Sequence, residues 1–118
     1  MKLILIVDDE IDITETFSLL FEVYGYAVIT ASDGSAALAL LQDRVPDLII
    51  SDCMMPVMDG VSFRKHVQND ARLADVPFVL MSAAPDRHDL SSITVDRFLK
   101  KPFQFDELMQ TVQSLLPN

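Results

Sequence analysis

The stretch LILIVDDE, residues 3–10, places five consecutive apolar residues directly before three acids. Three later apolar runs also stop at polar residues, namely LII before Ser51-Asp52, FVLM before Ser82, and FL before Lys100-Lys101-Pro102. Short, unbroken apolar runs are typical of strands buried in a parallel sheet. Because open α/β sheets bind ligands at the carboxyl ends of their strands, we expect these polar residues to share one cleft.

Strand and helix patterns alternate along the whole chain. The predicted strands are 3–7, 27–31, 48–51, 77–81 and 97–100, and the predicted helices are about 11–24, 34–44, 60–68 and 105–116. This alternation predicts an α/β fold, a five-stranded parallel sheet with helices on both faces. The segment 85–96 is rich in Asp, Ser and Thr, which are weak helix formers, so we expect only a short or frayed helix there.

Composition limits the classes of function. We expect a single domain over residues 1–118, half of them apolar, with 18 acidic and 9 basic residues and a formal charge of −9. An acidic domain is a poor nucleic-acid binder, because that affinity comes from cationic contacts to phosphates. Cys53 is the single cysteine, which fits a reducing cytoplasm. Neither a signal peptide nor a membrane-spanning run is recognisable, so we expect no membrane partner.

Asp8, Asp9 and Asp52 form a predicted metal site at two strand ends. Clustered carboxylates repel one another and resist ionising together, and a hard divalent cation removes that repulsion. An oxygen-only ligand set favours Mg²⁺, with Mn²⁺ as an alternative. One acid after a strand is usually a solvated turn residue, but three acids in this pattern favour the metal.

Three residues of the cleft suit phosphoryl chemistry. Asp52 is a candidate nucleophile, because carboxylates form acyl phosphates in phosphoryl transfer. Lys101 is a candidate cation for the phosphoryl oxygens, whereas strand alternation assigns Lys100 to the other face and to solvent. Ser82, followed by two alanines, leaves room for a ligand and offers a hydroxyl donor. Cys53, His66 and His88 are interpreted as structural or solvated.

The loop DCMMPVMDG, residues 52–60, completes a distinctive set of motifs. Together with LIVDDE, Ser82-Ala83 and Lys101-Pro102-Phe103, it resembles the response-regulator receiver domains of bacterial two-component signalling, over essentially the whole chain. The resemblance implies a flavodoxin-like three-layer sandwich with strand order 2-1-3-4-5. It also implies a magnesium-dependent phosphoacceptor that switches conformation to control an output partner.

The same resemblance implies a role for each residue of the cleft. Asp52 would accept a phosphoryl group from a histidine kinase or a histidine phosphotransfer protein. Ser82 and Lys101 would bind the phosphoryl oxygens, and Phe98 would be the switch aromatic that turns inward when Ser82 moves. The implied magnesium ligands are the side chains of Asp8, Asp9 and Asp52 and the backbone carbonyl of Met54. The implied docking residues for the donor's helices are Asp12, Ile13, Thr16 and Leu19.

Two departures from the family pattern carry expectations of their own. Met54 and Ala84 stand at positions whose side chains tune the removal of the phosphoryl group by water in receiver domains. Neither side chain can orient a water, so we expect slow self-dephosphorylation. Thr94-Val95 stand where the family usually has Gly-Ala, in a region that many receivers use for dimerisation, so the usual pairing is not assumed for this chain.

Two rival functions are considered beside the phosphoacceptor. A haloacid-dehalogenase-like phosphatase also uses an aspartyl phosphate, but it requires a second Asp where this chain has Met54, and a cap domain. A phosphorylation-independent interaction module on the same fold would not need the complete set of Asp, Ser and Lys. We therefore predict a signalling domain rather than an enzyme that turns over a substrate.

Overall fold

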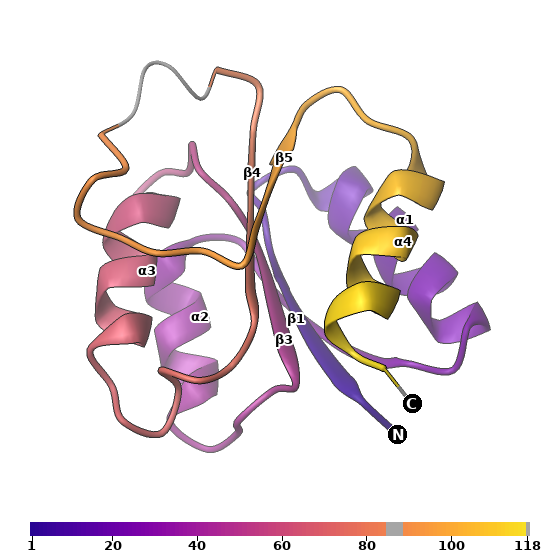
Figure 1. Cartoon of the computed structure of the whole chain (residues 1–118), viewed down its shortest axis with the longest axis horizontal. Coiled ribbons are helices and arrows are strands. Elements are labelled where there is room, and N and C mark those ends of the chain that lie inside the picture. Colours follow the sequence, from indigo (N-terminus) through magenta and orange to yellow (C-terminus); the bar gives the residue numbers. More distant parts are fainter. Residues whose placement is uncertain (85–88, 118) are drawn as a thin grey trace.

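A computed structural model describes residues 1–84 and 89–117, with one parallel sheet at its centre (Figure 1). The strands are β1 (Leu3–Val7), β2 (Ala27–Ala31), β3 (Leu48–Asp52), β4 (Phe78–Ser82) and β5 (Arg97–Lys100). Their order is β2-β1-β3-β4-β5, and every neighbouring pair is parallel. The predicted fold and strand order are confirmed.

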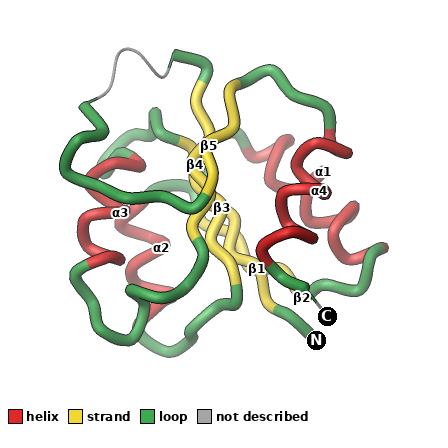
Figure 2. The backbone as a smooth tube through the Cα atoms, in the orientation of Figure 1, coloured by secondary structure: helices red, strands yellow, loops and turns green. Residues whose placement is uncertain are grey.

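In the part of the chain that the structure describes, helices cover both faces of the sheet, as Figure 2 shows. They are α1 (Ile11–Val23), α2 (Gly34–Leu41), α3 (Gly60–Gln68) and α4 (Phe105–Leu115). Side chains of α1 and α4 share one apolar cluster, and side chains of α2 and α3 share the other. Helix α2 ends three residues earlier than predicted, since its last residue is Leu41. No described helix is long and apolar enough to cross a membrane.

The central strands are apolar on both faces because each face is covered by helices. Leu5 and Val7 of β1 point into the cluster of α2 and α3, whereas Ile4 and Ile6 point into the cluster of α1 and α4. All residues of β3 and β4 are buried as well. An unbroken apolar run is therefore the pattern expected for a strand that is covered on both faces.

The segment between β4 and β5 differs from the prediction. Residues 89–96 form a turn and irregular structure, so the short or frayed helix predicted for 85–96 is wrong for its described part; 85–88, with His88, lie outside the described residues. Asp89 Oδ1 accepts hydrogen bonds from the Ser91 backbone N (3.0 Å) and from Ser91 Oγ (2.6 Å). Such local bonds compete with the backbone bonds of a helix.

Side chains of α3 hold this segment against the domain. Gln68 Nε2 donates to the Ser92 carbonyl (2.9 Å), and Gln68 Oε1 accepts from the Thr94 N–H (3.1 Å). Arg64 Nε donates to the Thr94 carbonyl (2.6 Å), and its guanidinium lies 4.8 Å from the centre of the Phe78 ring. These contacts from α3 hold the segment in place together with its apolar residues, which pack against the cluster of α2 and α3.

Candidate functional site

Three carboxylates meet at the carboxyl edge of the sheet. Asp8 and Asp9 follow β1, and Asp52 is the last residue of the neighbouring strand β3. One carboxylate oxygen from each of the three lies within 4.8 Å of the other two. The convergence expected from the strand ends is therefore observed for all three acids.

Lys101 brings a positive charge to the same place. Its Nζ lies 3.4 Å from Asp8 Oδ2 and 3.4 Å from Asp52 Oδ1. The Lys101 backbone N–H donates to the Ser82 carbonyl (2.9 Å), so the end of β4 positions the residue that follows β5. Lys100, as expected, is exposed.

Backbone contacts fix the carboxylates. The Glu10 N–H donates to Asp8 Oδ1 (3.0 Å), and the Cys53 N–H donates to Asp52 Oδ1 (2.9 Å). Gly60 packs against this point from the start of α3, because a Cβ there would overlap the Asp52 carbonyl oxygen and lie 2.9 Å from Cys53 Cα. Only glycine permits this close approach between the start of α3 and the end of β3.

Burial dominates the electrostatics of the site. The Asp8 side chain is fully buried and that of Asp52 is 8% exposed. Burial raises the pKa of both carboxyls, even though Lys101 opposes the shift. Burial acts to lower the pKa of Lys101, but the charges of Asp52 and Asp8 outweigh it and the pKa is raised. One ammonium thus faces three carboxylates, and it does not balance their negative charge.

The donor set fits Mg²⁺. It consists of oxygen atoms alone, close enough together to share one ion, and Asp9 is exposed, so that water can complete the coordination. It is also the only such group of acidic, His or Cys side chains found among the described residues. Met54 follows in the next loop with a 65% exposed side chain.

We expect Asp8→Asn to stabilise the metal-free protein at neutral pH. Since the folded pKa of Asp8 lies above its usual value of 3.8, its stabilising contribution is complete below that pH and is lost as pH rises through the folded pKa. The gain should be roughly 1 kcal/mol near neutrality. Asparagine can still accept from the Glu10 N–H, so the loop is kept.

Urea unfolding in a chelator across the acidic to neutral range measures this difference. The gain should shrink as pH falls and vanish well below 3.8, where the Asp8 carboxyl is neutral in both the folded and the unfolded protein. Asp75→Asn, at an exposed loop residue, serves as the control. An equal gain at all pH values would contradict an electrostatic origin.

The remaining predicted residues occupy different environments. Ser82 is buried, and its Oγ accepts from the Ala84 N–H (3.1 Å). Phe98 is half-buried in β5 and packs against the cluster of α2 and α3. On α1, Asp12, Thr16 and Leu19 are exposed, and the Leu19 side chain is 67% exposed. These residues therefore lie on an open helix face.

Ile13 belongs to a groove that the sequence patterns did not reveal. With Phe17 it faces Lys101, Pro102 and Phe103 across a hollow of about 230 Å³. The groove thus joins α1 to the loop that carries the site ammonium. The motif Lys101-Pro102-Phe103 was the available signal, but a motif does not show which helix lies across from it.

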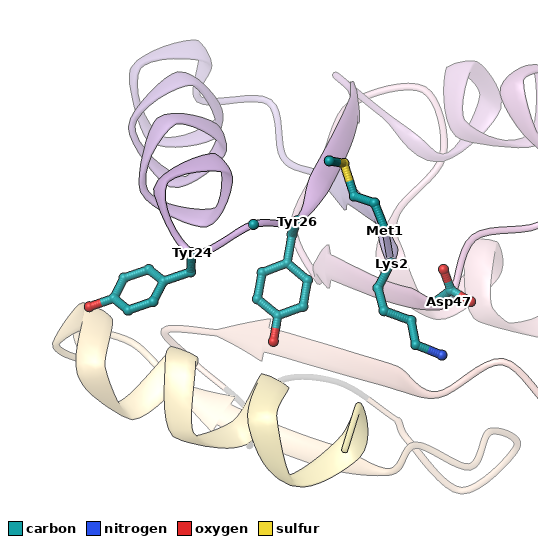
Figure 3. A pocket seen from close by; sticks show the side chains of 6 residues that line it. Met1, Lys2, Tyr24, Tyr26 and Asp47 are labelled. Atoms are coloured by element: carbon teal, nitrogen blue, oxygen red, sulfur yellow. The ribbon is translucent and has the colours of Figure 1, made fainter. Parts of the chain in front are cut away.

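A second hollow, of about 460 Å³, lies at the other end of the sheet (Figure 3). Its lining residues precede β1, β2 and β3, and they are Met1, Lys2, Tyr24, Gly25, Tyr26 and Asp47. Its charged side chains are Lys2 and Asp47, and Asp47 Oδ2 already accepts from the Leu3 N–H (2.7 Å). With one basic and one acidic side chain, this hollow is a weaker candidate for a metal or phosphate site than the acidic cleft.

Comparison with known proteins supports the same family. The family model of the response regulator receiver domain matches residues 4–113. A probable transcriptional regulator, ycf27 of Guillardia theta, is 35% identical over 96% of this chain and 44% of its own length. The chain spans about half the length of the curated relatives it matches.

Solved structures agree along their whole length. The chemotaxis response regulator CheY4 of Vibrio cholerae is 35% identical, with a TM-score of 0.90 over 98% of this chain and 99% of that one. The response regulator TrrA of Thermotoga maritima, solved in complex with Mg²⁺-BeF, is also 35% identical, with a TM-score of 0.87 over 98% and 100%. With its parallel sheet and acidic cleft, this chain belongs to the receiver domain family of two-component response regulators.

Proposed function

We propose that Asp52 is the phosphoacceptor, and that the donor is the phosphohistidine of a histidine kinase or histidine phosphotransfer protein. The observation that carries this proposal is the meeting of Asp52 with Asp8, Asp9 and Lys101 in one buried cleft. An Asp52 oxygen forms a bond to phosphorus while the bond from phosphorus to the imidazole nitrogen breaks, and the imidazole takes up a proton from solvent. The product is an acyl phosphate.

The other cleft residues are proposed to hold charge during transfer. Mg²⁺ held by Asp8, Asp9, Asp52 and the Met54 carbonyl would offset negative charge on the transferring oxygens. Lys101, 3.4 Å from Asp52, exchanges its carboxylate contacts for a phosphoryl oxygen. An ammonium serves as a compact point charge for phosphate.

Ser82 and Phe98 are proposed to convert phosphorylation into a conformational change. The Ser82 hydroxyl, which now accepts from the Ala84 N–H, turns to donate to a phosphoryl oxygen. Hydrogen bonds to charged groups contribute about 1.5–3 kcal/mol each. Two such bonds, from Ser82 and Lys101, supply most of the roughly 5.5 kcal/mol that moves a two-state equilibrium from about 1:99 to 99:1. Phe98 lies on β5, beside the strand that carries Ser82, and is proposed to turn inward when the Ser82 hydroxyl moves.

The donor's helices are proposed to dock on α1 through Asp12, Ile13, Thr16 and Leu19. Ile13 lines the groove beside Lys101, so that this face leads directly to the cleft. We place the domain in the cytoplasm, where the buried thiol of Cys53 stays reduced. As a phosphoacceptor it acts on its own aspartate, and it does not turn over phosphomonoesters.

Magnesium and a small phosphodonor test the proposal. At about 100 times its dissociation constant, Mg²⁺ should stabilise the protein by roughly 2.7 kcal/mol against urea. Acetyl phosphate with Mg²⁺ should add the mass of one phosphoryl group, and a chelator should prevent it. Rapid turnover of a phosphomonoester with no adduct would favour the phosphatase instead.

The phosphoryl group should be long-lived because Met54 and Ala84 cannot orient an attacking water. The double variant Met54→Asn with Ala84→Glu should shorten its lifetime by about tenfold, which corresponds to roughly 1.4 kcal/mol of activation free energy. The lifetime is measured by the decay of labelled protein after the donor is removed. Ala74→Glu, at an exposed site, controls for added charge. An unchanged or longer lifetime in the double variant would contradict this role.

A further inference from the structure

Arg64 of α3 is a buried charge that the proposed phosphoryl chemistry does not use. The residue is 4% exposed, and its Nη1 has no hydrogen-bond partner among the described residues. Burial lowers the pKa of its guanidinium, and the charge of Asp96 opposes this shift only in part. A guanidinium nevertheless keeps its proton in proteins, so a positive charge stays inside with one donor group unused. Burial of such a group disfavours the fold.

Arg64 occupies a position that the helix pattern assigns to the core. The buried residues of α3 are Gly60, Phe63, Arg64 and Val67, at the spacing of an inward-facing helix face. The guanidinium lies 4.8 Å from the centre of the Phe78 ring, and this cation–π contact offsets part of the desolvation. An apolar side chain at this position would avoid the desolvation altogether. The presence of arginine therefore indicates a role other than stability.

The contacts of Arg64 indicate that this role is to hold the segment before β5. Its Nε donates to the Thr94 carbonyl (2.6 Å). Gln68, one turn further along α3, binds the Ser92 carbonyl and the Thr94 N–H. We call Arg64 and Gln68 together the α3 clamp. The clamp fixes the backbone on both sides of Ile93.

The clamped segment shares an apolar cluster with Phe98. Leu90, Ile93 and Val95 are half-buried against the cluster of α2 and α3, and Phe98 packs against the same cluster. Because protein interiors are closely packed, the Phe98 ring can turn inward there only if other side chains are displaced. The three apolar residues of the segment belong to no helix or strand, so they are displaced more readily than buried strand residues. A segment fixed by the clamp opposes this displacement.

We infer that the α3 clamp holds the segment of residues 89–96, and with it Phe98, in the resting position, and that phosphorylation of Asp52 releases the clamp. This inference deepens the proposed function and rests on it. Movement of the segment breaks the bond from Arg64 to Thr94, but it also lets water reach Nη1, which has no partner in the resting position. Part of the lost interaction is thereby regained, so the clamp is a lock that the phosphoryl contacts can open.

Binding of beryllofluoride with Mg²⁺, a mimic of the phosphoryl group, tests the clamp. In Arg64→Met and in Gln68→Leu the resting position is less favoured, so the dissociation constant of beryllofluoride should fall about tenfold in each. Exchange of the Ile93 amide, which donates to the Leu90 carbonyl (3.3 Å), should speed up by a similar factor, while the amides of β1 exchange as in the wild type. Arg44→Met, at an exposed residue between α2 and β3, is the control and should match the wild type.

Thermal unfolding separates the clamp from a merely structural role. Gln68→Leu loses two hydrogen bonds and should unfold at a lower temperature than the wild type. Arg64→Met loses a buried charge and should unfold at the same temperature or a higher one. Beryllofluoride should bind more tightly to both variants, although their stabilities change in different directions, and a general loss of structure would not produce this result.

Three outcomes would count against these claims. An unchanged or weaker affinity for beryllofluoride in either variant would overturn the inference and leave the proposed function intact. A lower unfolding temperature in Arg64→Met would overturn the argument from the buried charge. If beryllofluoride with Mg²⁺ did not bind the wild type, the proposed function itself would fail.

Discussion

Asp52→Asn is expected to abolish phosphorylation by acetyl phosphate. The replacement removes the nucleophilic oxygen and keeps the shape, because asparagine can still accept from the Cys53 N–H at 2.9 Å. The rate should fall by at least about a thousandfold, or roughly 4 kcal/mol of activation free energy. Intact-mass measurement with Mg²⁺ present reads the outcome directly.

Other carboxylates provide the controls for this variant. Asp106→Asn, on the exposed first turn of α4, should be phosphorylated as fast as the wild type. Asp52→Asn should also be at least as stable as the wild type, because burial raises the pKa of that carboxyl and its charge disfavours the fold at neutral pH. Phosphorylation that persists in Asp52→Asn but disappears in Asp8→Asn would assign the nucleophile to Asp8.

The sheet and the acidic cleft could be predicted because their signals are local. An unbroken run such as Leu3–Val7 appears only where both faces of a strand are covered, and its end marks the edge of the sheet. Parallel strands bring Asp8, Asp9 and Asp52 to the same edge of the sheet, and they converge there because β1 and β3 are neighbours. The order of the strands came from the family resemblance, since periodicity alone does not determine it.

The segment before β5 could not be predicted because distant residues decide its structure. Its own Asp, Ser and Thr residues weaken a helix but do not show what replaces it. The structure of this segment depends on Gln68 and Arg64. Their side chains bind backbone groups of Ser92 and Thr94, which are 24 to 30 positions away in the sequence. Arg64 on a short helix is ordinarily a solvated residue, and here it is buried against Phe78.

The turn at Val57, whose φ is 66° and where the Met58 N–H donates to the Pro56 carbonyl (2.7 Å), could not be predicted for a different reason. Its residue type argues against its conformation, because valine disfavours positive φ. The conformation is imposed by Gly34 and Gly60, which let the loop pack closely at both ends. A sequence pattern indicates the backbone conformation that a residue type prefers. At Val57, contacts with other loops impose a different conformation.

Gly60→Ala is expected to cause the largest loss of stability of any small substitution at the cleft. The new Cβ would overlap the Asp52 carbonyl oxygen and lie 2.9 Å from Cys53 Cα, and both obstacles are backbone atoms that cannot rotate away. Either α3 moves outward or the end of β3 shifts. A loss of about 3 kcal/mol in the free energy of unfolding is expected for overpacking at such a site.

Gly25→Ala separates this overlap from the general effect of replacing glycine. Gly25 has a φ of 91°, but a Cβ there meets no atom within 4 Å, so only backbone strain is added. That strain should lower stability by about 1–2 kcal/mol. Urea unfolding of both variants measures the difference, and Mg²⁺ titration should show weakened binding in Gly60→Ala alone, because the shift displaces Asp52. Equal losses of stability with unchanged Mg²⁺ binding would show that the loop of residues 53–59 yields without disturbing the carboxylates.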